Sequence, residues 1–164
     1  MRLANKIAVL VVAMQWLSAC TSNVYLATTP EDAYPGAHSK IMVHVTNADH
    51  PDYIVLKRSH IYELSDDDTS QTKLTLHAPD TYPTCGNGIF GTLFTLGLIP
   101  THTPIREDFT YTLEENENST RYRHSLNMYE ATSIWEWLYK PFAEMETDVR
   151  ANALAVSNRE SARF

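Results

Sequence analysis

Cysteine and histidine are the residue types in this sequence that could supply a nucleophile or a metal ligand. The 164-residue chain has two cysteines, Cys20 and Cys85, and seven histidines. No two histidines form a His-x-His pair or the His-x-x-x-His pair of a helical zinc site. A loop site around His44 and His50, with Asp49 or Asp52, is an alternative. The scattered spacing nevertheless leads us to predict no metal and no cofactor.

The sequence also lacks the familiar motifs of catalysis. It has no Gly-x-Ser-x-Gly nucleophile elbow, and no Gly-Lys-[Ser/Thr] follows Gly86-Asn87-Gly88 to make a phosphate loop. The aspartates at 66–68 lack the spacing and glycine of a calcium loop, so we interpret them as a solvated turn. Cys85 is expected to be a small buried side chain. We therefore predict no enzymatic activity, with a hydrolase or thiol enzyme using Cys85 as the alternative.

Cys20 differs from Cys85 because of the residues that precede it. The first six residues include Arg2 and Lys6 and no acid, and residues 7–19 are almost wholly apolar. Such a run is too short to cross a hydrocarbon core of about 30 Å as a helix. Its charge, its length and the small residues at its end are typical of a secretory signal. We therefore predict a signal peptide over 1–19, cleaved between Ala19 and Cys20. An ordinary secretory signal and an uncleaved anchor are the alternatives.

The end of this signal, Leu17-Ser18-Ala19-Cys20, resembles the lipobox of bacterial lipoprotein precursors, Leu-[Ala/Ser/Thr]-[Gly/Ala]-Cys, at all four positions. The resemblance implies that the Cys20 thiol receives a diacylglyceryl group and that the new amino terminus is acylated, with palmitate as a typical chain. One acyl chain binds a membrane only marginally, whereas two or three anchor it effectively permanently. Thr21 stands where Asp would favour retention in the inner membrane of Gram-negative bacteria. The resemblance thus implies the periplasmic face of the cell outer membrane.

Once the signal is removed, the predicted mature chain is acidic. It retains 11 basic and 20 acidic side chains, a formal net charge of −9, because Arg2 and Lys6 are lost with the signal. This balance argues against nucleic acid as a partner and against attachment to anionic lipid by charge. Modification of Cys20 leaves Cys85 without an intramolecular disulfide partner. We therefore expect the membrane contact to be the lipid on Cys20 itself.

The mature chain is predicted to be a short tether followed by one α+β domain. Residues 20–39 contain proline, glycine, serine and threonine without a sustained period, which is typical of a tether. Residues 40–164 are the predicted domain. In that domain, alternating or continuous apolar residues predict strands, and the clearest pair forms a hairpin around a polar turn. The predicted strands cover 40–46, 53–56, 60–64, 72–77 and 89–99, and the hairpin pairs 108–114 with 121–129.

The C-terminal part changes to a helical period. Ser133 to Glu136 matches a capping box. Apolar residues three and four apart follow, and Pro141 should kink the helix. The stripe consists of Leu138, Phe142, Met145, Val149 and Val156, with Ala153 between the last two. The predicted fold is therefore an antiparallel sheet packed by a long, Pro-kinked C-terminal helix.

Aromatic residues supply the predicted binding surface. Trp135 and Trp137 cannot both face the same side of a helix, so one could lie on the sheet while the other meets a partner or lipid headgroups. With Phe94 they form the surface that we predict. The segment Thr95 to Pro100 resembles one found in small Gram-negative envelope lipoproteins of uncharacterised role, and that likeness extends loosely over residues 85–157.

These features predict a membrane-anchored, non-enzymatic envelope lipoprotein that acts as an accessory or assembly subunit and contacts another envelope protein. The alternative is a periplasmic lipoprotein that binds a small ligand or lipid in an apolar pocket between sheet and helix. That pocket would be lined by aromatic residues, namely Tyr82, Phe90, Phe94, Trp135 and Trp137.

Overall fold

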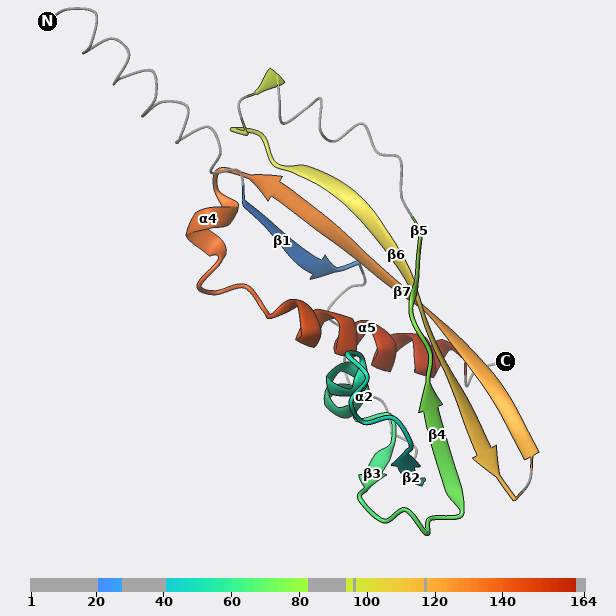
Figure 1. The fold of residues 1–164 in the computed structure, drawn as a ribbon. Coiled ribbons are helices and arrows are strands. Elements are labelled where there is room, and N and C mark those ends of the chain that lie inside the picture. The colour runs from blue at the N-terminus through green and yellow to red at the C-terminus, as the bar shows by residue number, and fades with distance from the viewer. Residues whose placement is uncertain (1–20, 28–40, 83–93, 96, 117, 162–164) are drawn as a thin grey trace, which may run out of the picture.

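The computed structural model describes residues 21–27, 41–82, 94–95, 97–116 and 118–161 (Figure 1). The predicted signal peptide, its cleavage site at Ala19 and Cys20, and the remaining cysteine, Cys85, lie outside the described residues. So do residues 28–39 of the predicted tether and residues 89–93 of the strand predicted over 89–99.

Seven strands of the described residues form one mixed sheet, ordered β1-β7-β6-β4-β2-β3, with β5 also paired to β6. The parallel pairs are β2 with β3 and β2 with β4, and the other pairs are antiparallel. The prediction of an antiparallel sheet was therefore wrong at the β2 edge, because a helix rather than a hairpin turn connects β2 to β3. The strands are β1 (Thr21–Leu26), β2 (Met42–Val45), β3 (Glu63–Ser65), β4 (Thr72–Leu76), β5 (Asp80–Tyr82), β6 (Thr101–Glu115) and β7 (Asn118–Ser133).

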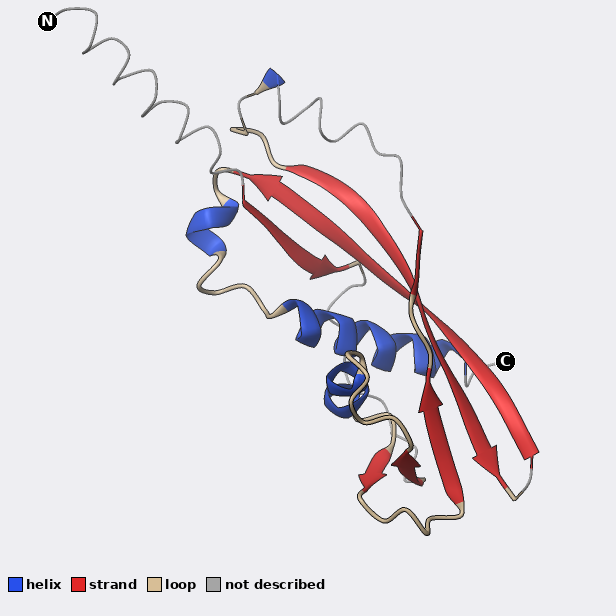
Figure 2. Ribbon diagram, in the orientation of Figure 1, coloured by secondary structure: helices blue, strands red, loops and turns tan. Residues whose placement is uncertain are grey.

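The helices are α2 (Tyr53–Ser59), α4 (Glu136–Tyr139) and α5 (Glu146–Ser161). Figure 2 shows α5 running alongside the sheet, and α2 packs against α5. Alternate residues of the strands meet apolar residues of both helices to make the core. The largest fully buried apolar members are Tyr111, Phe109, Leu56, Ile61, Leu74, Leu126 and Leu154.

The β6–β7 hairpin confirms the hairpin predicted from the sequence and is longer at both ends. Its register runs from Thr101 opposite Thr132 to Glu115 opposite Asn118. Phe109, Tyr111 and Leu113 of β6 are buried as expected, but Glu107, Asp108 and Thr110 between and before them are buried too, so both faces of β6 are covered there. The predicted strands over 40–46 and 72–77 are confirmed by β2 and β4.

The strand predicted over 53–56 was wrong, because these residues begin α2. Val55, Leu56 and Ser59 are buried in α2, at spacings that place them on one face of a helix. His60, with φ of 53°, ends the helix in a left-handed conformation. A four-residue apolar run cannot by itself distinguish a buried strand from a buried helix turn. The strand predicted over 60–64 is present in part as β3.

The described part of the strand predicted over 89–99 is also not a strand. Leu98 donates its backbone N–H to the carbonyl of Thr95 at 3.0 Å, which closes a turn. Gly97, at the centre of this turn, has φ of 77°, a conformation that glycine adopts without steric cost. The segment therefore reverses direction where the apolar run predicted extended chain.

The prediction of one continuous C-terminal helix was wrong. Pro141 lies between α4 and α5, so the chain forms two separate helices, of 4 and 16 residues, instead of one kinked helix. Lys140 still has helical dihedral angles, with φ of −51° and ψ of −38°, but Pro141 has no N–H to donate, so the hydrogen-bond series of α4 ends there. The predicted apolar stripe is also interrupted at Pro141. Phe142 and Met145 are exposed, whereas Val149 and Val156 are buried.

The predicted tether is ordered at its start. Thr21–Leu26 forms β1, an edge strand that pairs with the last residues of β7, with Thr21 opposite Ser133 and Leu26 opposite Met128. Pairing with an existing strand supplied backbone hydrogen bonds that the composition of the segment did not reveal.

Candidate binding surface

The short helix α4 begins where β7 ends, and Ser133 holds this junction. The Ser133 hydroxyl oxygen accepts hydrogen bonds from the backbone N–H groups of Trp135 and Glu136, both at 3.2 Å. This is one half of the predicted capping box. The reciprocal half is replaced by other contacts, because the Glu136 carboxylate lies against β1.

Glu136 joins α4 to the edge strand. Its side chain is buried, and its Oε2 accepts hydrogen bonds from Asn23 Nδ2 and from the Tyr25 hydroxyl, both at 2.8 Å. Asn23 Nδ2 also donates to the Glu136 backbone carbonyl at 3.0 Å. Burial and the neighbouring Glu136 carboxylate raise the pKa of Tyr25 to about 12, because both disfavour the phenolate. These bonds fix the position of a helix that is too short to be stable alone.

A second connection holds the turn at 95–99 against the same junction. The indole N–H of Trp135 donates to the Leu98 carbonyl at 2.8 Å, and the Ile134 N–H donates to the Gly97 carbonyl at 3.0 Å. Leu98 and Ile99 are 55% and 60% exposed. The turn therefore adds two exposed apolar side chains beside Trp135.

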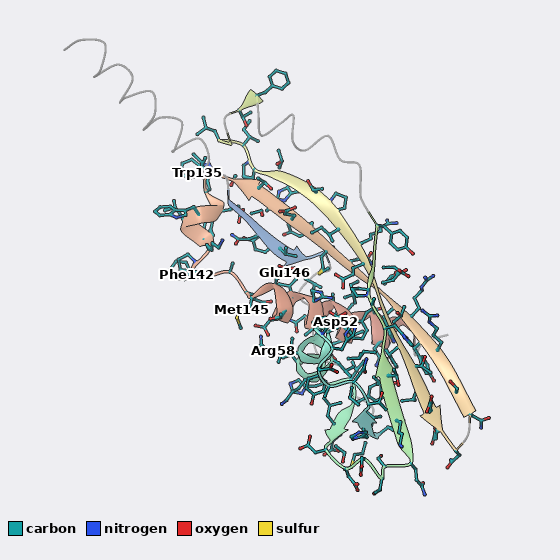
Figure 3. The ribbon with its side chains drawn as sticks, in the orientation of Figure 1. Asp52, Arg58, Trp135, Phe142, Met145 and Glu146 are labelled. Atoms are coloured by element: carbon teal, nitrogen blue, oxygen red, sulfur yellow. The ribbon has the colours of Figure 1, made fainter. Side chains whose placement is uncertain are left out.

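The apolar side chains of the α4 region are exposed and gather at one end of the molecule. Figure 3 shows Trp135 and Phe142 at α4 and the segment after it, away from Asp52 and Arg58 at α2, whereas Met145 lies further along, at the start of α5. Soluble monomers rarely leave a contiguous apolar patch of this kind uncovered. We call this patch the α4 surface, and its members are Trp135 (44% exposed), Trp137 (62%), Leu138 (51%), Tyr139 (59%), Phe142 (86%) and Met145 (58%).

The structure thus brings Trp135 and Trp137 to one exposed region, although neither lies flat on the sheet as one of them was expected to. Phe94, 84% exposed, lies just before the turn that contacts Trp135. Phe142 and Met145 were assigned to the core by their helical spacing. Pro141 could have indicated that they lie outside the core, because a helix break at this residue interrupts the predicted apolar stripe.

Buried charges gather elsewhere, around Arg150 of α5. Its Nη2 donates to Asp52 Oδ1 at 2.6 Å and to Glu107 Oε1. Asp52 precedes α2 and Glu107 lies in β6, so the cluster joins three elements. Burial alone would lower the pKa of Arg150, but the contacts with Glu107 and Asp52 outweigh it and raise the pKa. All three side chains are at most 15% exposed, which favours a role in holding the fold.

The histidines considered for a loop metal site take part in separate contacts. His44 Nδ1 lies 3.2 Å from the Ser65 carbonyl oxygen, and His50 Nδ1 lies 3.9 Å from Asp52 Oδ2. Within the described ranges, no group of three or more His, Cys, Asp or Glu side chains is arranged to hold a metal ion.

The interface between the sheet and α5 is filled by a packed cluster in which Val149 and Leu154 of α5 meet Leu126 of the sheet. A hollow of about 430 Å³ lies beside it, between β1 and the segment joining α4 to α5. Most of its lining is polar, unlike the apolar pocket that the ligand-binding alternative requires. It is lined by Ser22, Asn23, Val24, Ile105, Glu130, Lys140, Ala143, Glu144 and Glu146.

No helix among the residues that the structure describes is both long enough and apolar enough to cross a bilayer.

No protein-family model matches the sequence, and no curated protein matches it. The chain is similar to the crystal structure of a minor lipoprotein from Acinetobacter baumannii, with a TM-score of 0.37 and 14% sequence identity. The match covers 79% of this chain and 95% of that one.

Proposed function

We propose that this chain is a non-enzymatic envelope lipoprotein, held in the outer membrane by lipid on Cys20, which acts as an accessory or assembly subunit. The observation that carries the proposal is the position of the lipobox cysteine. Cys20 is bonded directly to Thr21, the first residue of β1. The lipidation motif therefore leads straight into the sheet.

This direct connection gives the lipid a second role besides attachment. Thr21 pairs with Ser133, and β1 is fixed to α4 through Asn23 and Tyr25. A flexible tether would let the domain turn freely above the membrane. A strand that begins next to the acylated residue instead holds one end of the domain against the bilayer.

The arrangement of polar groups supports a role in binding rather than catalysis. The buried charges of Arg150, Asp52 and Glu107 contact one another and join separate elements. The sheet face turned away from the core carries exposed polar side chains in β7, among them Arg123 and Asn127. A polar, sheet-borne surface of this kind suits contact with another envelope protein.

Membrane fractionation of cells tests the anchor. The wild type and Cys85→Ser should both sediment with membranes, because Cys85 has no part in lipidation. Cys20→Ala should appear in the soluble fraction, since it lacks the thiol that accepts the diacylglyceryl group. Membrane retention of Cys20→Ala equal to that of Cys85→Ser would contradict the proposal.

Density-gradient separation of the two membranes tests the location. The wild type, with Thr21 after the cysteine, should band with the outer membrane. Thr21→Asp should shift the protein to the inner membrane, while a matched Thr21→Ser variant should not. A wild type that bands with the inner membrane would contradict the location and leave the anchor untouched.

Crosslinking in intact cells, followed by purification of the chain, tests the accessory role. An envelope protein should be recovered with the wild type. Its recovery should fall for Asn127→Glu, which adds a charge to the exposed sheet face and leaves the ion pairs of Arg123 with Asp80 and Asp108 intact. Recovery of no envelope protein from the wild type would contradict the accessory role.

A further inference from the structure

We propose that the α4 surface lies in the headgroup region of the same bilayer that holds the lipid of Cys20, so that Trp137, Phe142 and their neighbours form a second membrane contact. This inference rests on the proposed lipid anchor and goes beyond it. It adds a set of side chains that would fix the tilt and height of the domain.

The first argument is position. Thr21 lies opposite Ser133 in the β1–β7 register, and Trp135 follows Ser133 by two residues. Steps of about 3.8 Å along the chain and about 5.5 Å across the pair place the Cα atoms of Cys20 and Trp135 within about 17 Å. The proposed lipidation site therefore borders the α4 surface. Figure 1 shows the same closeness, with α4 beside the first residues of β1.

The second argument is the chemistry of the exposed side chains. Trp135, Trp137 and Tyr139 combine apolar rings with an N–H or O–H group, and such residues are enriched where membrane meets water. Phe142 and Met145 add purely apolar area. A shallow and mostly apolar hollow of about 310 Å³ is lined by Trp137, Leu138, Lys140 and Pro141. An acyl chain beside a lipid phosphate matches that combination.

The third argument is the distribution of charge. The exposed acids Glu63, Asp66, Asp67, Asp68, Glu114 and Glu115 lie in or near the β3–β4 loop and the β6–β7 turn. Figure 1 shows these elements at the end of the sheet opposite α4. An acidic group near anionic headgroups would be repelled. A domain that sits on Trp137 and Phe142 points this acidic end away from the membrane, while Glu144 and Glu146, which are exposed on either side of Met145, keep that edge of the α4 surface on the water side of the headgroups.

The fourth argument is the rigidity of the support. Glu136, in the same helix as Trp137, has its carboxylate buried against Asn23 and Tyr25. The Trp135 ring is also fixed by its hydrogen bond to Leu98. The exposed rings therefore project from a helix that is held in place, so they can enter a bilayer without first becoming ordered.

The sequence supplies its own reporter for a test. Its three tryptophans are Trp16, in the predicted signal, and Trp135 and Trp137. Tryptophan fluorescence of the mature protein therefore reports on the α4 surface alone. The lipidated protein would be placed in phosphatidylcholine vesicles, with or without bromine on the upper part of the acyl chains, which quenches nearby indoles.

The control moves the reporter to the other end of the sheet. In a Trp135→Phe, Trp137→Phe background, Tyr122→Trp introduces one indole at a residue that is 38% exposed in β7. We expect brominated lipid to remove roughly half of the wild-type emission, as for indoles at the membrane interface. It should leave the Tyr122→Trp emission nearly unchanged. Trp137→Phe and Trp135→Phe, tested singly, should each retain quenching of the remaining indole.

The two proposals fail in different ways. If the wild-type protein floats with the vesicles and brominated lipid does not quench its tryptophans, the α4 surface is not in the bilayer, and the inference is wrong while the anchor stands. The same conclusion follows if Tyr122→Trp is quenched as strongly as the wild type. If the purified wild type carries no lipid and does not float, the anchor itself is wrong.

Discussion

The core under α5 and the α4 surface use the same kinds of residue in opposite ways. In the core, Phe109 and Tyr111 are at most 1% exposed and packed between sheet and helices. At α4, Trp137 and Phe142 are 62% and 86% exposed, although their helix is fixed to the sheet by buried hydrogen bonds. Aromatic residues in the core stabilise the fold through burial. Those at α4 are exposed and contribute little through burial, and we propose that they contact a bilayer.

The buried polar groups of the two regions differ in a related way. The Arg150 cluster joins α5, β6 and the residue before α2, and thus crosses the centre of the domain. The Glu136 cluster joins only α4 to β1, at one end. Changes at Arg150 should therefore unfold the domain, whereas changes at Glu136 should release the α4 surface. The following predictions test that difference, from the largest expected effect to the smallest.

Arg150→Met should lower the free energy of unfolding by about 3–5 kcal/mol, because it leaves the buried carboxylates of Asp52 and Glu107 without their cation. Chemical denaturation of the mature domain measures the change. Arg58→Met is the matched control, since the Arg58–Asp148 pair, at 2.6 Å, is about one-third exposed at both side chains. An exposed pair of this kind contributes about 0–1 kcal/mol. Equal losses in the two variants would contradict a central role for the Arg150 cluster.

Glu136→Ala should cost about 2 kcal/mol, because Asn23 and Tyr25 lose their buried acceptor. The same change should bring the pKa of Tyr25 down from about 12, since both the charge and the hydrogen bond of the carboxylate are removed. Ultraviolet titration of tyrosine measures this shift. In Glu136→Gln, which keeps an acceptor without the charge, the pKa of Tyr25 should lie between its values in the wild type and in Glu136→Ala. A Tyr25 pKa unchanged in Glu136→Ala would show that the Glu136 contact does not form.

The stability of the core should fall below neutral pH because of His124. Burial lowers the pKa of His124, so the folded state resists the proton that the unfolded chain takes up below about pH 6.5. Stability should therefore decrease as pH falls from 6.5 to the folded-state pKa, by at most about 1.4 kcal/mol per pH unit for one proton. His124 Nε2 contacts the Tyr111 hydroxyl, which also contacts Tyr62, so His124→Phe leaves Tyr111 with a partner. That variant should show a flatter profile in urea unfolding. If the stability of His124→Phe falls as steeply with decreasing pH as that of the wild type, groups other than His124 cause the pH dependence.

Phe142→Ser and Trp137→Ser should change the free energy of unfolding by less than about 0.5 kcal/mol each, because both rings are already exposed. Phe109→Ser in the core is the contrasting variant, and it should be strongly destabilised. Thermal unfolding of the three proteins is sufficient to rank them. A large loss of stability in Phe142→Ser would mean that the α4 surface packs against the chain.

Much of the sheet could be predicted from the sequence, whereas the surroundings of α4 could not. Strict alternation around Phe109 and Leu126 indicates a half-buried hairpin, because period two is specific to strands. Residues 53–56 offered too short an apolar run to distinguish helix from strand. The pairing of β1 with β7 depends on a partner strand more than 100 residues away, so the local composition of β1 does not indicate it.

The candidate surface was predicted in part for a similar reason. Trp135 and Trp137 were assigned to the binding surface with one of them expected on the sheet, and both are exposed. Phe142 and Met145 were misassigned to the core because helical spacing was extended across Pro141. The Glu136 carboxylate matched a local cap in sequence, yet it is bound by two side chains of β1. Tertiary partners decided both outcomes.

The most direct test of the central claim is the intact mass of the protein purified from membranes, with fragmentation of its amino-terminal peptide. We predict a chain that begins at Cys20, carries a diacylglyceryl group on its thiol and bears an acyl chain on its amino terminus. A protein that retains Met1, or one that begins at Cys20 with an unmodified thiol, would contradict the lipid anchor.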